Sequence, residues 1–372
     1  MKKVAIYRNQ LFKLSETFIV NQALAIKDFD VEFMGREAVN PVPSTSLRVS
    51  TSSTGHVSKI YQALTMSPRA LLRTTKENPP DIVHAHFSVD GLYALRYAKK
   101  LGIPLFTTLH GYDVTTSRNN LLLSKSPSWV NYALFQKQLK HGGQLFLCVS
   151  DYIRQKAIEA KYPESKTLTH RIGIDTDVFR AIHNNKTERI ILHVGRLVEK
   201  KGTEILIDAI SMIKHRLNGY QLHIIGDGPL RNFLDAKIRI LGLSEHIKIL
   251  GELPHHCVID KLKGSSIVVV PSVQAKSGDC EGLPTIIMEA AAFSLPVIGT
   301  YHSGIPEAII DEKTGYLVKE RDVVSLAHRI AHLIESESLQ ATLGAAGRKL
   351  METEFNLKTQ TARLEKMYEA FL

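Results

Sequence analysis

Residues 279–292 read Asp279-Cys280-Glu281-Gly282-Leu283-Pro284-Thr285-Ile286-Ile287-Met288-Glu289-Ala290-Ala291-Ala292, and this segment changes character halfway along. Its first half has the composition of a turn, in which Gly282 frees the backbone. Its second half is apolar and rich in helix formers, and Pro284 suits a first helical position because its missing N–H needs no partner there. A helix that begins so abruptly presents unpaired N–H groups and a partial positive charge, which favour a phosphate.

Two carboxylates bracket this helix start. Glu281 stands just before it, and Glu289 lies one turn past Thr285. Acidic residues at a helix start can also merely complement the helix dipole. A phosphate site flanked by two acceptor-only side chains suits a ligand that carries both phosphates and hydroxyls, and a nucleotide sugar is such a ligand.

The length and the order of predicted elements indicate two α/β domains. A chain of 372 residues is too long for one ordinary core. Strands alternate with helices throughout, which predicts two doubly wound parallel sheets. Residues 37–56 are predicted to be a loop and residues 58–74 a single helix. The predicted strands are 4–7, 31–34, 81–86, 104–109 and 144–149 in the front half, and 189–194, 221–225, 247–250, 267–270, 296–299 and 316–318 in the back half.

Four candidate residues follow directly on predicted strands: His110, Arg196, Gly226 and Glu281. Ligands of doubly wound sheets bind outside the carboxyl ends of the strands. Arg196 and Lys201 offer a planar fork and a point charge, which suit a diphosphate, although an ordinary solvated basic run would look the same.

Several other patterns leave their alternatives open. His110 could line a pocket or simply be packed, and His86 is the nearer of two alternating histidines to its strand end. Asp175 and Asp177 could bind a metal, but aspartate is a common turn former, and no metal site is expected. The three cysteines are scattered, so neither a disulfide framework nor a zinc site is indicated.

The positive charge is unevenly placed. The net charge is +10, and residues 1–180 hold 24 Lys and Arg against 14 Asp and Glu, so this half carries the whole excess. It should face an anionic partner, although a basic solvated surface is the alternative. Aromatic residues at helical spacing interleave with lysines here and could lie on a membrane or in the core. These residues are Trp129, Tyr132, Phe135 and Leu139, with Lys125, Lys137 and Lys140.

Taken together, the motifs resemble the retaining family-4 glycosyltransferases of the GT-B fold. The matching segments of the back half are 195–202, 226–229, 251–254, 281–289, 296–300 and 304–318. The front half matches more loosely, through His110-Gly111-Tyr112-Asp113 and residues 173–179. Ser15-Glu16-Thr17-Phe18-Ile19 resembles the bacterial exopolysaccharide and O-antigen subgroup, of the colanic-acid or amylovoran type. Residues 8–12 stand where many relatives carry a Gly-Gly loop, which puts a phosphate role for that loop in doubt.

The resemblance implies a domain layout. Two Rossmann-like domains would face each other across a cleft, and the C-terminal helix would cross back to the first domain. The expected bounds are 1–175 for an acceptor-binding domain, 176–188 for a linker, 189–352 for a donor-binding domain and 353–372 for the returning helix.

The resemblance also implies residue roles. Glu289 would accept hydrogen bonds from the ribose, Glu281 would hold the donor sugar, and Arg196, Lys201 and the helix N–H groups would hold the diphosphate. The implied catalytic residues are His110, Glu281, Arg196 and Lys201. The implied donor-binding residues are Gly195, Arg196, Lys201, Gly226, Leu250, Leu253, Glu281, Gly282, Leu283, Pro284, Thr285 and Glu289, and those on the acceptor side are Glu16, Thr17, His86, Tyr112 and Asp113.

The implied activity is a metal-independent, retaining hexosyl transfer without a cofactor. The donor would be a UDP- or GDP-linked sugar, and the acceptor a lipid-linked glycan of surface polysaccharide synthesis. The protein would work in the cytoplasm, bound peripherally to the anionic inner face of the cell membrane, and would bind no nucleic acid. The alternatives are a nucleotide-sugar epimerase on the same fold, which needs no basic acceptor domain, and a non-catalytic nucleotide-sugar sensor.

Overall fold

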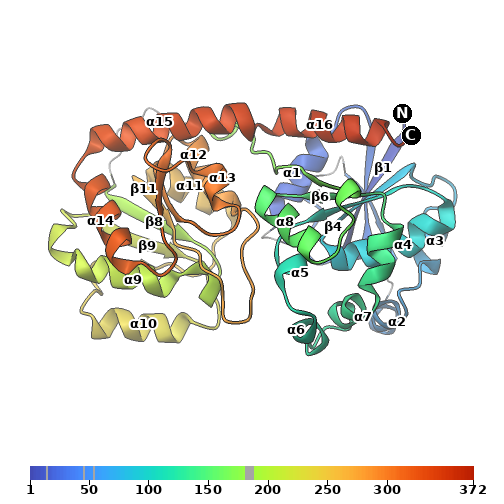
Figure 1. Ribbon diagram of the computed structural model, residues 1–372, viewed down its shortest axis with the longest axis horizontal. Helices are drawn as coiled ribbons and strands as arrows, with labels where there is room; N and C mark the ends of the chain where they lie inside the picture. Colours follow the sequence, from blue (N-terminus) through green and yellow to red (C-terminus); the bar gives the residue numbers. More distant parts are fainter. Residues whose placement is uncertain (14–15, 45–46, 53–54, 181–187) are drawn as a thin grey trace. The chain divides into compact units, whose positions relative to one another are not determined.

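The computed structural model describes residues 1–13, 16–44, 47–52, 55–180 and 188–372. Ser15 and residues 181–187 of the expected linker lie outside these ranges. The chain divides into two compact units (Figure 1). The first domain comprises Met1–Gly173 and Leu357–Leu372, and the second comprises Ile174–Asn356. Within the described ranges, no helix has the length and apolar character needed to cross a bilayer.

The first domain is built on a seven-stranded parallel sheet in the order β3-β2-β1-β4-β5-β6-β7. Two edge strands, β3 and β7, were not predicted, because their short, largely polar sequences bury little and contain no apolar run. Strand β3 lies inside the predicted loop 37–56, and no strand was predicted where β7 lies. The strands are β1 (Lys3–Leu11), β2 (Asp30–Ala38), β3 (Arg48–Thr51), β4 (Ile82–His86), β5 (Leu105–Leu109), β6 (Leu145–Cys148) and β7 (Thr167–Thr169).

The predicted helix over 58–74 is two helices in the structure. Met66 takes a left-handed conformation with φ of 54°, and Pro68 precedes the second helix, so the first cannot continue. The helices of this domain are α1 (Thr17–Ala25), α2 (His56–Thr65), α3 (Arg69–Thr74), α4 (Ser88–Leu101), α5 (Tyr112–Thr115), α6 (Arg118–Leu122), α7 (Pro127–Gly142), α8 (Asp151–Glu159) and α16 (Leu357–Glu369).

The last helix, α16, is integrated into the first domain. The Tyr368 hydroxyl lies 2.5 Å from Nδ1 of the buried His84. The Glu365 carboxylate accepts the backbone N–H groups of Lys27 and Asp28 at 2.6 and 2.7 Å. Tyr368 also packs edge-on against Phe106 in the core. The predicted return of the C-terminal helix to the first domain is therefore confirmed.

The second domain holds a six-stranded parallel sheet in the order β10-β9-β8-β11-β12-β13. All six strands match predicted ones, which confirms two doubly wound α/β domains. The strands are β8 (Ile190–Val194), β9 (Gln221–Ile225), β10 (Ile247–Ile249), β11 (Ile267–Val270), β12 (Val297–Thr300) and β13 (Gly315–Val318). The helices are α9 (Thr203–Met212), α10 (Arg231–Ile240), α11 (His255–Gly264), α12 (Thr285–Ala292), α13 (Ile305–Ala308), α14 (Val323–Ile334) and α15 (Glu337–Glu354).

Candidate active site

The segment that begins α12 forms an abrupt turn into a helix. Pro284 is the N-cap, with φ of −63° and ψ of 118°, and not the first helical residue as predicted. Its extended backbone turns the chain, and its carbonyl accepts the N–H of Ile287 at 3.1 Å. No side chain of the described residues caps this helix. The N–H groups at its start are therefore available to an anion.

Glu281 is buried beside two lysines. Lys201 Nζ lies 3.0 Å from Glu281 Oε1, and Lys200 Nζ lies 3.9 Å from the same oxygen. Burial raises the pKa of Glu281, but the two ammonium groups outweigh it and hold the pKa below its usual value. The carboxylate is therefore charged at neutral pH. Lys200, which the sequence did not single out, also pairs with Asp279 at 3.1 Å.

The backbone of Glu281 is held by the segment that follows β12. The Glu281 N–H donates to His302 Nε2 at 3.2 Å, and the Ser303 hydroxyl donates to the Glu281 carbonyl. Because Nε2 of His302 accepts, Nδ1 carries the proton and donates to Glu320 Oε1 at 2.7 Å. This chain of contacts fixes Glu281 in place, and sequence reasoning missed His302 and Ser303 entirely.

The loops after β8 and β9 approach each other closely. A Cβ on Gly226, whose φ is 137°, would lie 2.0 Å from the Gly195 carbonyl oxygen. The aliphatic part of Lys201 lies against Gly195 in turn, since a Cβ there would meet Lys201 Cδ at 3.0 Å. The Arg196 side chain is exposed and makes no hydrogen bond or ion pair with any described residue, and only its carbonyl is bonded, to the Val198 N–H. Its guanidinium is therefore available to a ligand.

Glu289 is buried on α12 and already has a partner. Its Oε1 lies 3.1 Å from Nε2 of His255, the first residue of α11. This hydrogen bond raises the pKa of His255, against the lowering effect of burial. Leu250 and Leu253 are half-buried in the loop between β10 and α11, next to His255 in the sequence. The structure thus brings together Glu289 and the loop predicted to flank the base, and it adds His255.

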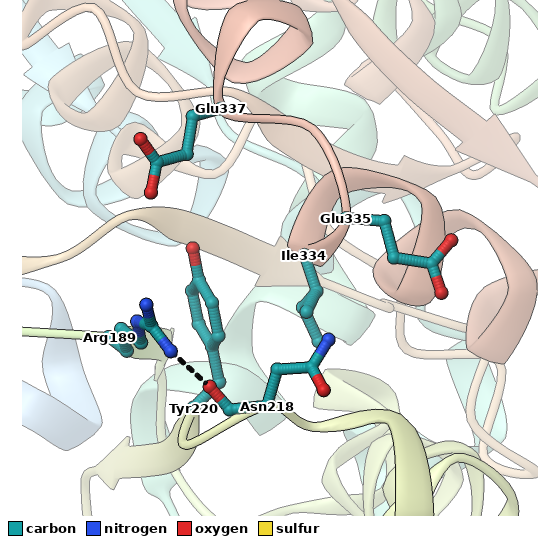
Figure 2. Close-up of a pocket in the computed structure, with 6 residues that line it drawn as sticks. All are labelled: Arg189, Asn218, Tyr220, Ile334, Glu335 and Glu337. Atoms are coloured by element: carbon teal, nitrogen blue, oxygen red, sulfur yellow. Dashed lines mark hydrogen bonds between the residues drawn. The ribbon is translucent and has the colours of Figure 1, made fainter.

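A hollow of the second domain lies at the opposite end of the sheet. It has a volume of about 550 Å³ and is lined by Arg189, Asn218, Tyr220, Ile334, Glu335 and Glu337 (Figure 2). Arg189 directly precedes β8, and Tyr220 directly precedes β9. The hollow is therefore at the amino ends of the strands and contains no predicted site residue.

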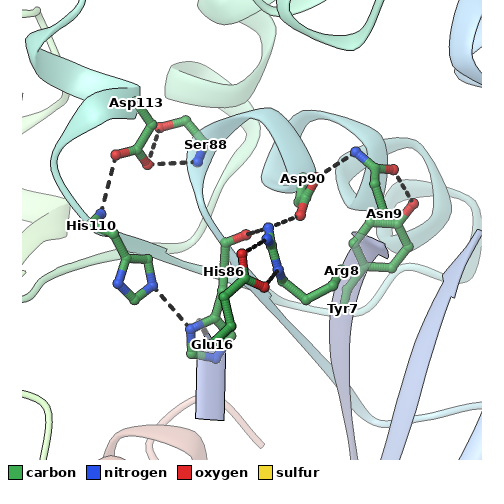
Figure 3. A network of polar contacts seen from close by, with 9 residues as sticks. All are labelled: Tyr7, Arg8, Asn9, Glu16, His86, Ser88, Asp90, His110 and Asp113. Carbon is green, nitrogen blue, oxygen red and sulfur yellow. Dashed lines mark hydrogen bonds and ion pairs between the residues drawn. The ribbon is translucent and has the colours of Figure 1, made fainter. Parts of the chain in front are cut away.

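In the first domain, Arg8 is the centre of a buried polar network (Figure 3). Its guanidinium donates to both Glu16 carboxylate oxygens, at 3.1 and 2.6 Å, and also binds Asp90 and the His86 carbonyl. Burial lowers the pKa of Arg8, but Asp90 and Glu16 raise it by more. Glu16 was predicted to face the acceptor. Both oxygens of its carboxylate are bound by Arg8 of the same domain.

His86 and His110 form a neutral pair (Figure 3). Nδ1 of His86 lies 3.1 Å from Nε2 of His110. Burial is the main cause that holds the pKa of each ring well below its usual value. His110 packs against the rings of Phe18 and Phe87, with centroids 5.2 and 4.3 Å away. His86 is buried, so it bears on a ligand through His110, which is partly exposed.

Asp113 fastens the turn that carries His110. One carboxylate oxygen accepts the N–H groups of His110 and Gly111, and the other accepts the N–H and hydroxyl of Ser88, all within 2.8–3.1 Å. Burial raises the pKa of Asp113, and these hydrogen bonds oppose it. Asp113 is thus a buried residue that fixes this turn.

Two other predicted acceptor residues begin helices. Tyr112 begins α5, and its ring meets that of Trp129 edge-on with centroids 4.9 Å apart, whereas Thr17 begins α1.

A small polar pocket lies over the Arg8 network. Its volume is about 220 Å³, which is below the ~300–1,000 Å³ usual for drug-sized ligands. Of the predicted acceptor residues, Glu16 lines it. The lining residues are Arg8, Asn9, Gln10, Lys13, Glu16, Arg36, Phe87, Val89, Asp90, Ser126, Ser128 and Trp129.

The membrane interpretation of α7 is wrong for three of its residues, since Leu139 is buried together with Tyr132 and Lys140. Tyr132 is buried and its hydroxyl donates to the Asp113 carbonyl at 3.2 Å. Lys140 is also buried and donates to Gln136 and to the Ala160 carbonyl at 2.6 and 2.5 Å, and burial lowers its pKa to about 8. All three belong to the core because α7 packs against α4 and α6. Lys125 and Lys137 are exposed.

Comparisons with known families and proteins agree with this architecture. The family described as Glycosyl transferases group 1 matches residues 175–350, and Glycosyltransferase Family 4 matches residues 20–178. AmsK of Erwinia amylovora, an amylovoran biosynthesis glycosyltransferase, is 32% identical over 309 residues, which cover 81% of this chain and 73% of AmsK. WcaL of Escherichia coli, provisionally named a colanic acid biosynthesis glycosyltransferase, is 31% identical over 78% of this chain and 70% of its own.

Two solved structures share the fold. HepE of Anabaena, in complex with UDP and glucose, superposes with a TM-score of 0.81 at 18% identity over the full length of both chains. Sucrose-phosphate synthase of Thermosynechococcus elongatus gives a TM-score of 0.80, also at 18% identity, over all of this chain and 99% of the other.

Proposed function

Because the chain belongs to the family-4 glycosyltransferases, which share the GT-B fold, we propose that it moves a sugar from a UDP- or GDP-linked donor to a lipid-linked glycan with retention of configuration. The observation that carries the proposal is the buried Glu281–Lys201 ion pair beside the uncapped start of α12. HepE, a neighbour in fold, was solved with UDP and glucose, which supports a nucleotide-sugar donor.

Negative charge builds on the leaving diphosphate as the bond to the sugar breaks. The unpartnered Arg196 guanidinium, the Lys201 ammonium and the α12 N–H groups are proposed to stabilise it electrostatically. The charged Glu281 would accept hydrogen bonds from sugar hydroxyls, and Glu289 from the ribose. The acceptor oxygen would attack the anomeric carbon on the face that the phosphate leaves, and the leaving phosphate oxygen would take its proton.

The first domain is proposed to bind the acceptor. Neutral His110 and the pocket over the Arg8 network offer polar groups and the Trp129 ring to a glycan. AmsK and WcaL are named for amylovoran and colanic acid biosynthesis, which supports a role in bacterial exopolysaccharide synthesis. The acceptor would be carried by a membrane lipid, so the protein is proposed to act at the cytoplasmic face of the membrane as a peripheral protein.

A panel of nucleotide sugars, each incubated with and without bacterial lipid extract, tests this function. Transfer predicts that nucleoside diphosphate is released and that label enters the lipid fraction, both only with extract. Conversion of the sugar without lipid would instead show an epimerase, and binding without turnover would show a sensor. The anomeric configuration of the product, read by NMR coupling constants, tests retention separately.

Replacing Glu289 with alanine is expected to weaken UDP or GDP binding by about 10- to 100-fold, which corresponds to the ~1.5–3 kcal/mol of a charge-assisted hydrogen bond. Isothermal titration calorimetry with each nucleoside diphosphate measures this directly. Because Glu289 is buried and bonded to His255, thermal unfolding of the same variant checks that the fold persists. Unchanged affinity would exclude Glu289 as the ribose ligand.

The reaction is expected to need no divalent metal, because Arg196, Lys201 and the helix start supply positive charge to the diphosphate. Turnover should therefore persist in EDTA. Activity that disappears in EDTA and returns with magnesium or manganese would contradict this. Asp175 would then be examined first, although it accepts the N–H groups of Asp177 and Val178 at 2.9 and 3.2 Å as a turn former does.

A further inference from the structure

Helix α2 has the reverse of the usual arrangement of apolar and polar side chains. Its apolar residues Val57, Ile60, Tyr61 and Leu64 recur at i, i+3, i+4 and i+7, the spacing of one helix face. They are 82%, 47%, 54% and 57% exposed, whereas the polar Gln62 is buried. The Gln62 side chain donates to the Ser52 carbonyl at 3.0 Å and accepts the Ser52 hydroxyl at 2.6 Å. The helix therefore turns its polar side to the protein and its apolar side to solvent.

The orientation of α2 is fixed by contacts at its C-terminal end. The Asn131 amide of α7 donates to the carbonyls of Ala63 and Leu64 at 2.8 and 3.2 Å, and the Tyr93 hydroxyl also donates to Ala63. Arg96 donates to the Thr65 carbonyl at 2.8 Å. These bonds hold the last turn against α4 and α7, so the outward apolar face is a feature of the fold.

The neighbouring helix α7 extends this face. Leu134, one turn beyond Asn131 on α7, is 50% exposed. Figure 1 shows α2, α6 and α7 together at one end of the first domain. We call the five residues Val57, Ile60, Tyr61, Leu64 and Leu134 the apolar patch. Contiguous exposed apolar groups of this kind mark binding surfaces.

The segments that carry the apolar patch contain no acidic residue. Residues 38–76 hold five Lys and Arg, and residues 114–150 hold four, without one Asp or Glu in either segment. These segments include α2, α3, α6 and α7. Six of these nine cations lie on the four helices, although Lys140 is buried and Lys59 pairs with Glu37 of β2. An anionic partner fits this charge.

We propose that the apolar patch enters the headgroup layer of an anionic lipid bilayer, while the surrounding cations bind the lipid phosphates. A bilayer offers both an apolar phase and a negative surface, and short amphipathic helices bind it in the interface plane. Nucleic acid would use the cations but leave the apolar residues in water. The inference rests on the proposed function, because a lipid-linked acceptor requires access to a membrane.

The first test removes the apolar groups alone. The double variant Ile60→Ser, Leu64→Ser should bind vesicles of phosphatidylglycerol and phosphatidylcholine at least about tenfold more weakly than the parent chain in co-sedimentation. The matched control is Ile240→Ser on α10 of the second domain, where Ile240 is 83% exposed, and it should bind like the parent. Equal binding by parent and double variant would overturn the proposal, as would failure of the parent to bind.

The second test changes charge alone. Lys125 and Lys137 are exposed, so Lys125→Glu, Lys137→Glu should weaken binding, whereas Lys140 is buried and is left intact. The control Arg239→Glu, Lys313→Glu makes the same change of net charge at exposed sites of the second domain and should bind like the parent. The parent should ignore neutral vesicles and detach in high salt, which screens charges beyond ~10 Å at 0.1 M. Equal losses in both variants would leave only a general charge effect.

The third test measures how deeply the apolar patch enters the bilayer. Tyr61→Trp should be quenched by lipids brominated on the acyl chain, and Ile240→Trp should not. Calorimetry with UDP and GDP on every variant separates the two proposals, since a lost membrane contact leaves nucleotide binding unchanged. A chain that binds vesicles but transfers no sugar would instead contradict the proposed function alone.

Discussion

Replacing Lys201 with alanine is expected to lower kcat by about 100- to 1,000-fold, the usual effect of removing one preorganised group that stabilises developing charge. Lys201 pairs with Glu281 at 3.0 Å and is proposed to face the leaving diphosphate. Its loss removes a cation from the diphosphate and leaves Glu281 buried with Lys200, which is 3.9 Å away and already bound to Asp279.

The same variant should shift the pH profile in a defined direction. Burial raises the pKa of Glu281, and Lys201 is the largest cause that lowers it. Without Lys201 the pKa of Glu281 rises, so its carboxylate becomes protonated at a higher pH. The acid limb of the kcat/KM profile therefore moves to higher pH. Lys201→Arg keeps the charge and should keep the acid limb in place. A rate loss with an unmoved acid limb would show that Lys201 does not act on Glu281.

Replacing Asp90 with alanine is expected to destabilise the first domain by about 3–5 kcal/mol, because it leaves the buried Arg8 guanidinium without one of its carboxylate partners. Glu16 still pairs with Arg8, so the expected loss of stability is near the lower end of this range. Trp129 is the sole tryptophan of the chain and lies in this domain, so its fluorescence during urea unfolding reports on this domain.

Two controls accompany that measurement. Glu77→Ala removes an exposed carboxylate of the same domain and should change stability by less than about 0.5 kcal/mol. Arg8→Met combined with Asp90→Ala should cost less than the sum of the two single variants, because the pair is then removed together. Additive costs would show that Arg8 and Asp90 do not act as a pair.

Much of the second domain could be predicted from sequence because its strands are apolar runs bounded by Gly, Pro or polar turns. Strands β9 and β11 have the predicted bounds of 221–225 and 267–270. In the first domain, β3 and β7 are short edge strands that lack such runs. The break at Pro68 was readable in the sequence, since the residue before a proline rarely continues a helix.

The candidate site was predictable as a set of motifs and not as a set of contacts. Arg196 and Lys201 lie in the segment after β8, and Glu281 lies in the segment after β11, so their shared sheet edge could be inferred. His302 and His255 could not, because their contacts with Glu281 and Glu289 depend on how β12 and α11 are placed. Periodicity identifies one face of a helix but does not say whether that face meets the core. Tyr132 proved to be buried and Leu64 exposed for that reason.

The position of α16 also governs the order in which the protein can be completed on the ribosome. The first domain needs Leu357–Leu372, which are translated only after Ile174–Asn356. At ~5–20 residues per second, the ribosome spends roughly 10–40 s on the intervening domain. Throughout that time the place of Tyr368 against His84 and Phe106 stays empty in the nascent chain. The domain that is translated first is therefore finished last.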